Sequence, residues 1–196
     1  MLQQLIDLSM GACLLSLVAL SLALLMRNRL IILFLTIGFS IAGVALITQP
    51  TLTIPVKNAS VADWNAKSFW YEPWGNSIVH RGIDIFGKRG TPILSSTDSL
   101  IIFTGDIKVG GLVILAIDRS LRVHYYAHLA AIDTHRWKFV QRGDQIGRLG
   151  ASGNAFNKPP HLHYSLLSII PQPWEITSQT LGHLRAFYLN PIAWFE

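Results

Sequence analysis

The chain has 196 residues, of which 51% are hydrophobic and only 14% are charged, and Lys and Arg exceed Asp and Glu by 16 to 11. This length allows one ordinary domain with a small addition, and so low a charge is unusual for a soluble globular protein. The excess of basic over acidic residues suits an anionic partner. The sequence has no long basic run, no Arg-rich helix and no recognisable nucleic-acid module, so no nucleic acid is expected as a partner.

Two uncharged apolar runs of 19 residues each, 8–26 and 30–48, lie near the N-terminus. Each approaches the roughly 20 residues that a helix needs to cross the hydrocarbon core of a bilayer. Only the segment Arg27 to Arg29 separates them. The pattern predicts a transmembrane helical hairpin over residues 1–49, and therefore a lipid bilayer as a partner.

Three other interpretations of this region are less favoured. A cleaved signal peptide would need a basic start and a shorter apolar stretch, whereas this N-terminus lacks Lys and Arg and carries Asp7. Lipidation of Cys13 is disfavoured because the apolar run continues well past it. A hairpin buried in a soluble core is disfavoured by two uncharged runs in succession. A membrane anchor explains the region best.

The orientation of the hairpin follows from its charges. Arg27 and Arg29 are the only basic residues before Lys57, so the positive-inside rule places the turn in the cytoplasm. Both ends then face outward. The sequence thus predicts a multi-pass protein of the cytoplasmic (inner) membrane with its C-terminal domain outside. The single cysteine, Cys13, lies in the first run, so no disulfide is expected in that domain.

The rest of the chain divides into a short connection and a β-rich domain. Residues 50–64 combine Pro, Thr, Ser and Asn without helical periodicity, which predicts a linker. Over residues 65–196, short runs rich in β-branched and aromatic residues alternate with Gly, Pro, Asn and Asp. The predicted fold is therefore mainly β, with an antiparallel sheet. The expected strands are Gly82–Phe86, Ile93–Ser95, Leu100–Thr104, Leu112–Ile117, Leu121–Ala127, Gln145–Leu149 and His161–Leu167, with a hairpin turn at Asp118-Arg119-Ser120.

Two pairs of residues in this domain have spacings that suit a metal site. His80 and Asp84 are four apart, and on a strand such positions share one face. By itself this pair is a weak signal. His161 and His163 flank Leu162, so on a strand both imidazoles point the same way, roughly 6.5–7 Å apart. They suit either two metal ligands or one ligand beside one acid–base group.

The other histidines carry weaker signals. His128 shares a strand face with Tyr126 and His124 if that strand is regular. We expect His124 to be a half-exposed strand residue, and His135 and His183 to be surface residues, since the latter two lie in loop-like sequence without a partner.

Zinc catalysis needs three protein ligands and an open position for water or substrate. The ion lowers the pKa of bound water from 15.7 toward about 7 and polarises a carbonyl, while uncoordinated imidazoles handle protons and the oxyanion. Four histidines in the three motifs above, with Asp84, are enough for this chemistry.

Seven short motifs in series also resemble one known family. They are His80-Arg81-Gly82-Ile83-Asp84, Gly90-Thr91-Pro92, Tyr126-Ala127-His128-Leu129, Gln141-Arg142-Gly143-Asp144-Gln145-Ile146-Gly147, Gly150-Ala151-Ser152-Gly153-Asn154, Pro160-His161-Leu162-His163-Tyr164 and Asn190-Pro191. In this order, over about residues 70–194, they are similar to the lysostaphin-type, LytM-like zinc endopeptidases.

The resemblance implies roles that spacing does not give. It implies that His80, Asp84 and His163 bind one Zn²⁺. It implies that His128 and His161 form the catalytic pair beside the metal, one accepting a proton from the attacking water and the other stabilising the oxyanion. We favour His161 as the base. Some members of the family have lost ligands and activate other wall hydrolases, but this chain retains all five residues.

Together with the predicted membrane hairpin, the resemblance implies a membrane-anchored zinc metalloendopeptidase that hydrolyses peptide cross-links or stem peptides of bacterial peptidoglycan. Two alternatives stay open: a non-catalytic wall-binding scaffold or activator of another wall hydrolase, and a zinc peptidase acting on secreted proteins. The sequence leaves open whether a membrane or envelope partner gates access. It also leaves open whether Tyr71 lines the groove or is a packed surface aromatic residue.

Overall fold

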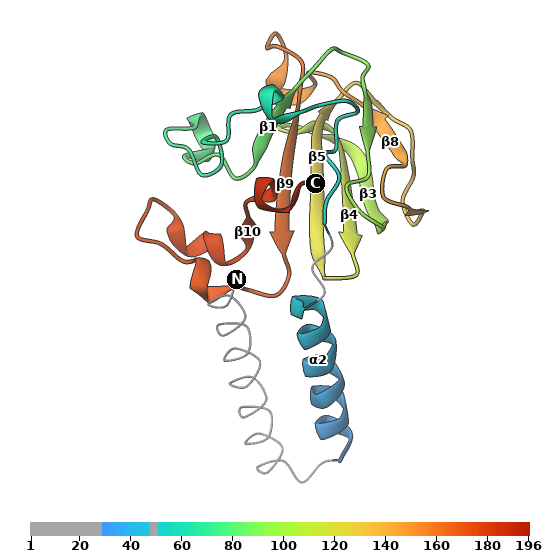
Figure 1. The fold of residues 1–196 in the computed structure, drawn as a ribbon, viewed down its shortest axis with the longest axis vertical. Coiled ribbons are helices and arrows are strands. Elements are labelled where there is room, and N and C mark those ends of the chain that lie inside the picture. Colours follow the sequence, from blue (N-terminus) through green and yellow to red (C-terminus); the bar gives the residue numbers. More distant parts are fainter. Residues whose placement is uncertain (1–28, 48–50) are drawn as a thin grey trace. The chain divides into compact units, whose positions relative to one another are not determined.

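The computed structural model describes residues 29–47 and 51–196 (Figure 1). The chain divides into two compact units, residues 1–49 and 50–196. In the first unit, helix α2 (Arg29–Ile47) covers most of the second predicted span, whereas the first predicted span, 8–26, lies outside the described residues. Within the described ranges, no helix combines the length and the apolar character that crossing a membrane requires.

The second unit contains two antiparallel sheets. The larger one has seven strands in the order β1-β9-β5-β4-β3-β7, with β10 paired to β9, and the smaller one has the order β2-β8-β6. The strands are β1 (Ile83–Phe86), β2 (Pro92–Leu94), β3 (Ser99–Ile107), β4 (Gly111–Asp118), β5 (Arg122–Leu129), β6 (Ala131–Ile132), β7 (Phe139–Val140), β8 (Gln145–Arg148), β9 (His161–Ser168) and β10 (Tyr188–Leu189). The prediction of a mainly β, antiparallel domain is confirmed.

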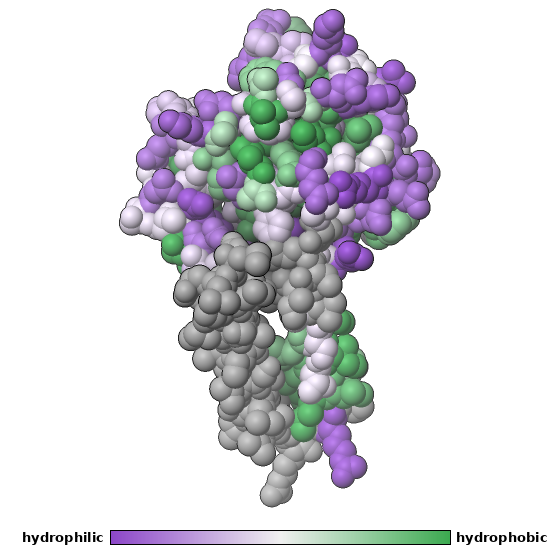
Figure 2. Space-filling view, viewed as in Figure 1, coloured by the Kyte–Doolittle hydropathy of each residue, from purple (hydrophilic) through white to green (hydrophobic). Residues whose placement is uncertain are grey.

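Alternation along the strands separates a core face from an accessible face. In β9, Leu162 and Tyr164 are fully buried in the main hydrophobic cluster, while His163 between them is partly exposed. Successive strand residues point to opposite faces, so a buried pattern at alternate positions leaves the intervening side chains for the other face. Figure 2 shows green, hydrophobic side chains near the centre of this domain within a mostly hydrophilic surface.

The predicted strands all form, with ends that differ by up to a few residues. The predicted turn at Asp118 to Ser120 joins β4 to β5, and the Asp118 carboxylate accepts hydrogen bonds from the backbone N–H groups of Ser120 and Arg122. Strands β6, β7 and β10 were not expected, because a strand of two residues shows no periodicity.

The predicted linker over residues 50–64 needs correction. Leu52 is fully buried and forms an isolated bridge with Phe195, and Val56 forms another with Ile93 in β2. Trp64 packs edge-on against Phe195. Because apolar side chains anchor this stretch at several points, residues 51–64 are part of the β domain.

Candidate metal centre and catalytic groove

All five predicted site residues line one groove of ≈ 870 Å³ on the accessible face of the larger sheet. Strand β1 contributes Asp84, β5 contributes His128, and β9 contributes His161 and His163. His80 lies just before β1, so the expectation that one strand carries both His80 and Asp84 is wrong. His135 and His183 are exposed and do not line the groove, as expected.

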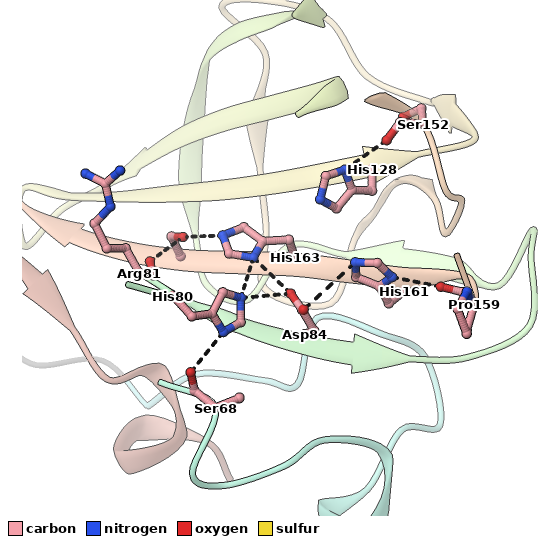
Figure 3. A network of polar contacts seen from close by, with 10 residues as sticks. Ser68, His80, Arg81, Asp84, His128, Ser152, Pro159, His161 and His163 are labelled. Atoms are coloured by element: carbon pink, nitrogen blue, oxygen red, sulfur yellow. Dashed lines mark hydrogen bonds and ion pairs between the residues drawn. The ribbon is translucent and has the colours of Figure 1, made fainter. Parts of the chain in front are cut away.

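Three potential ligand atoms converge at the centre of this groove (Figure 3). Asp84 and His163 are directly paired across β1 and β9, which brings Oδ1 of Asp84 to 2.9 Å from Nδ1 of His163. The preceding loop brings Nε2 of His80 to 3.1 Å from the same oxygen and 3.0 Å from Nδ1 of His163. Among the described residues, this is the one group of three or more His, Cys, Asp or Glu side chains whose atoms lie close enough to hold a metal ion.

The ring protons of both histidines are held outside this cluster. Nδ1 of His80 donates to the carbonyl oxygen of Ser68 at 2.9 Å. Oγ of Ser165 donates to the carbonyl oxygen of Arg81, so it accepts from Nε2 of His163 at 3.0 Å. Outer partners of this kind set the tautomer of a metal-binding histidine.

The two inner nitrogens, Nε2 of His80 and Nδ1 of His163, therefore present lone pairs to each other. Lone pairs at this distance repel unless a proton or a cation lies between them. Two imidazoles and one carboxylate are a donor set that suits catalytic zinc. The residues thus fit the metal that the motifs imply.

The protonation states of the cluster also suit a cation. Burial alone would raise the pKa of Asp84, but in the absence of a cation the close contacts with His163 and His80, and the charges of these rings when they are protonated, outweigh it and hold the pKa below its ordinary value. Burial lowers the pKa of His163. An ionised carboxylate and neutral imidazoles are the forms that bind a metal ion.

The position of His128 depends on an irregularity in β5. The pairing of β4 with β5 shifts register between Leu112 and Ile114, and His128 has a φ of 66° in the left-handed region. A β-bulge of this kind bends the strand and re-aims a side chain. The strand is therefore not regular, and His128 turns into the groove while His124 and Tyr126 are fully buried.

Among the described residues, Nε2 of His128 and Nε2 of His161 have no hydrogen bond, although Nε2 of His161 lies 4.0 Å from Oδ2 of Asp84. Nδ1 of His128 donates to the carbonyl oxygen of Ser152 at 2.9 Å, and Nδ1 of His161 donates to that of Pro159 at 2.8 Å. Their ring centroids lie 5.1 Å apart. Burial, with the nearby charges of His161 and His163, lowers the pKa of His128 to about 4, so this ring is neutral near pH 7. A neutral ring whose Nδ1 is a donor has Nε2 available as an acceptor.

Sequence reasoning missed two neighbours of the metal residues. Trp74 stacks on His80 with ring centroids 4.0 Å apart, and it lies in a loop without periodicity that would reveal it. Ser165 could have been found, because it lies two residues after His163 on the same strand face. Tyr71 is 52% exposed, contacts Trp74 edge-on, and does not line the groove.

The expectation for His124 is wrong. This residue is not half-exposed but fully buried, and it contacts the Asp118 carboxylate at 3.2 Å and the Tyr164 hydroxyl at 2.6 Å. It points to the core face of the sheet, opposite to the groove.

Comparisons with known proteins cover the part of the chain that forms this groove. The model of Peptidase family M23 matches residues 78–171. The L-Ala–D-Glu endopeptidase of Bacillus subtilis (strain 168) is 33% identical over 134 residues, which cover 64% of this chain and 41% of that protein. The peptidoglycan DD-endopeptidase ShyA of Vibrio cholerae is 31% identical over 88 residues, covering 45% of this chain and 20% of that protein. This chain thus spans less than half the length of either relative.

A solved structure shares the fold as well. The catalytic domain of the antimicrobial peptidase lysostaphin from Staphylococcus simulans superposes with a TM-score of 0.50 at 25% identity, over 62% of this chain and 83% of that one. The matched segment 78–171 contains all five groove residues that the motifs singled out. Over this segment the chain is similar to peptidase family M23, and its motifs resemble those of the lysostaphin-type members of that family.

Proposed function

We propose that this chain is a zinc metalloendopeptidase that hydrolyses peptide cross-links or stem peptides of bacterial peptidoglycan. The observation that carries the proposal is the convergence of His80, Asp84 and His163, with inward lone pairs, beside two histidines whose Nδ1 protons are bonded elsewhere and whose Nε2 atoms are acceptors. The names of the two relatives denote different bonds, so the resemblance to the family does not specify the bond that is cut.

The proposed reaction divides the work among these residues. A zinc ion held by His80, Asp84 and His163 would supply polarisation of the scissile carbonyl and an activated water. His161 accepts the proton of the attacking water at Nε2 and later delivers it to the leaving amine. His128 lies beside His161, and it must take up a proton at Nε2 before it can donate to the developing oxyanion, because its neutral ring presents a lone pair there. The hydrogen bonds from Nδ1 to Pro159 and Ser152 hold both rings in place for this chemistry.

The test is digestion of isolated sacculi by the purified full chain, with the released fragments identified by mass. We expect cleavage within stem peptides or cross-links, loss of cleavage after zinc is removed by a chelator, and recovery when zinc is restored. If sacculi stay intact with zinc bound, the enzymatic proposal fails and the alternative of a non-catalytic wall-binding scaffold or activator gains support.

The alternative of a peptidase for secreted proteins is tested in parallel. Unfolded protein and wall fragments are offered at equal peptide concentration. Faster cleavage of the wall fragments supports the proposal, whereas faster cleavage of the unfolded protein supports the alternative.

We propose in addition that the N-terminal region anchors the domain in the cytoplasmic membrane, with the peptidase domain outside. The two uncharged runs, 8–26 and 30–48, and the arginines between them support this topology. Helix α2 exposes apolar side chains, as a helix facing lipid does, among them Ile31, Leu33, Phe34, Ile37 and Ile41. Since α2 alone does not meet the requirement for a span, the proposal rests on the whole N-terminal region.

Reporter fusions test this topology. A reporter that is active only outside the cytoplasm is fused at the Arg27–Arg29 turn or after about residue 55. The second fusion should be active and the first silent. Replacing both arginines by Gln and adding Lys near Gln3 should weaken or invert the arrangement. A cytoplasmic location of the second fusion in the otherwise unmodified protein would contradict the anchor and separate the domain from its proposed substrate.

A further inference from the structure

The groove continues past the metal residues on both sides. One end is lined by Lys158, Pro159 and Phe86, and the other by Arg81 and Tyr188. In Figure 3 the side chain of Arg81 extends past His163, at the end of the site away from His161 and Pro159.

The charges along this groove are unevenly distributed. Besides histidines, the charged residues that line it are Arg81, Asp84 and Lys158. The Asp84 carboxylate lies within 3.1 Å of His80 and 2.9 Å of His163 and belongs to the metal cluster. The charges left for a ligand away from the metal residues are therefore both positive, and such a groove favours a ligand with negative charge.

Arg81 is the better placed of these two cations. Lys158 is exposed, whereas Arg81 is half-buried, with its guanidinium 5.5 Å from the centroid of the Tyr188 ring. Within the described part of the chain, this guanidinium has no hydrogen bond or ion pair. Its donors are thus free, and their planar fork matches the two oxygens of a carboxylate.

The backbone of Arg81 is coupled to the metal residues. Its carbonyl oxygen accepts from Oγ of Ser165, which in turn holds Nε2 of His163. Arg81 also follows His80 directly in the chain. A group bound by the guanidinium is consequently held in a defined position relative to the metal centre.

We propose that Arg81 binds a free carboxylate of the substrate next to the scissile bond, and so selects stem peptides over neutral glycine bridges. This inference rests on the proposed function and narrows its substrate class. Stem peptides carry free carboxylates on their D-glutamyl and diaminopimelyl residues, whereas a glycine bridge has no charge along its length.

The test uses matched peptides and the zinc-loaded full chain. One stem peptide carries the free carboxylate, a second carries a carboxamide at that position, and pentaglycine with an acetylated N-terminus and an amidated C-terminus is the neutral reference. The wild-type chain should prefer the carboxylate over the carboxamide by about 10-fold to 100-fold in kcat/KM, the range for a charged hydrogen bond. Arg81→Gln should reduce this ratio to nearly one by lowering the rate on the carboxylate peptide alone. Arg81→Lys should keep part of the preference, since it retains the charge without the fork.

Two control variants remove a positive charge elsewhere. Arg119→Gln lies at an exposed turn outside the groove and should leave the ratio unchanged. Lys158→Gln, at the other end of the groove, should reduce the ratio by less than Arg81→Gln. The inference is overturned if the wild-type ratio is near one, or if Arg81→Gln slows both peptides equally, because an equal loss indicates a structural role.

A binding measurement keeps this inference separable from the proposed function. If the wild-type chain cleaves neither the peptides nor sacculi, the peptidase proposal fails, and the same ratio is then taken from Kd values measured by calorimetry. Preferential binding of the carboxylate peptide that Arg81→Gln abolishes still supports carboxylate recognition. Equal binding of both peptides refutes it.

Discussion

Two of the His–Asp pairs in the domain have nearly the same separation but different surroundings. In the groove, Nε2 of His80 lies 3.1 Å from Asp84, and in the core, Nε2 of His124 lies 3.2 Å from Asp118. We call the latter two residues the buried pair. Both nitrogens of His124 have protein partners, because Nδ1 meets the Tyr164 hydroxyl at 2.6 Å.

The difference shows what makes a metal site. At His80 and His163 the outer nitrogens are bonded to protein oxygens, which leaves the inner lone pairs facing Asp84. In the buried pair no lone pair of His124 is left over, and no further His, Cys, Asp or Glu among the described residues joins it in a metal-binding group. A short His–Asp distance is therefore not sufficient. A third donor is also required, together with an outer acceptor that takes the proton of each ring and leaves the inner lone pair for the metal.

The largest effect should come from removing one donor of the groove. Replacing His163 by Ala leaves two ligands, so the zinc content of the purified chain should fall from close to one ion to nearly none. Hydrolysis of wall fragments should fall by at least roughly 10³-fold, because the ion supplies several kcal/mol of transition-state stabilisation. Metal analysis and fragment release provide the two measurements. His135→Ala, at an exposed site outside the groove, is the control and should change neither quantity.

The two histidines beside the metal residues should separate binding from catalysis. His128→Ala and His161→Ala should each retain zinc yet lose roughly 10²–10⁴-fold in activity, the usual range for a general acid or base. The acceptor lone pairs at Nε2 of these two rings motivate this division, since neither ring belongs to the convergent group. Zinc loss in either variant as complete as in His163→Ala would show that the assigned roles are wrong.

The buried pair should affect stability and leave the metal in place. Asp118 is 4% exposed, and in addition to His124 it accepts from the backbone N–H groups of Ser120 and Arg122. Asp118→Ala leaves these donors and the buried Arg122 charge uncompensated. The free energy of unfolding in urea should fall by about 3–5 kcal/mol. The control Asp133→Ala breaks an ion pair with the more exposed Arg148 and should cost only about 0–1 kcal/mol.

The same carboxylate predicts a loss of stability in acid. Burial alone would raise the pKa of Asp118, but hydrogen bonding to His124 and the charges of His124 and Arg122 outweigh it and lower the pKa. Because its pKa is lower in the folded than in the unfolded chain, Asp118 stabilises the fold fully above about pH 3.9, the value of a free aspartate. This contribution is lost as pH falls through the folded pKa. Urea unfolding between pH 3 and pH 6 should show a steeper loss for the wild-type chain than for Asp118→Asn, and parallel curves would refute the assignment.

The sequence predicted the groove better than the core beneath it. Alternation in His161-Leu162-His163 predicted which side chains share a face, because a strand has a fixed period of two. The same rule failed at His128, where a bulge breaks the period, and at His80, which lies before the strand begins. The burial of His124 could not be predicted from its strand, because its pattern suits a half-exposed position. Only the tertiary partners Asp118 and Tyr164 make its burial favourable.

The smallest effect, and the sharpest test of the comparison, concerns the outer partner of His163. Oγ of Ser165 accepts from Nε2 of His163 and donates to the carbonyl oxygen of Arg81, so it fixes the tautomer that directs Nδ1 toward Asp84. Ser165→Ala removes that partner and keeps all three ligands. Zinc affinity, measured by competition with a chelator, should fall about 10-fold to 100-fold, the usual cost of losing an outer hydrogen bond. Ser165→Thr retains a hydroxyl and should recover part of the affinity. If Ser165→Ala binds zinc as tightly as the wild-type chain, the ligand geometry is fixed by the strand register of Asp84 and His163 alone. The groove and the buried pair then differ only by the third donor, and the outer partner of each ring is not required.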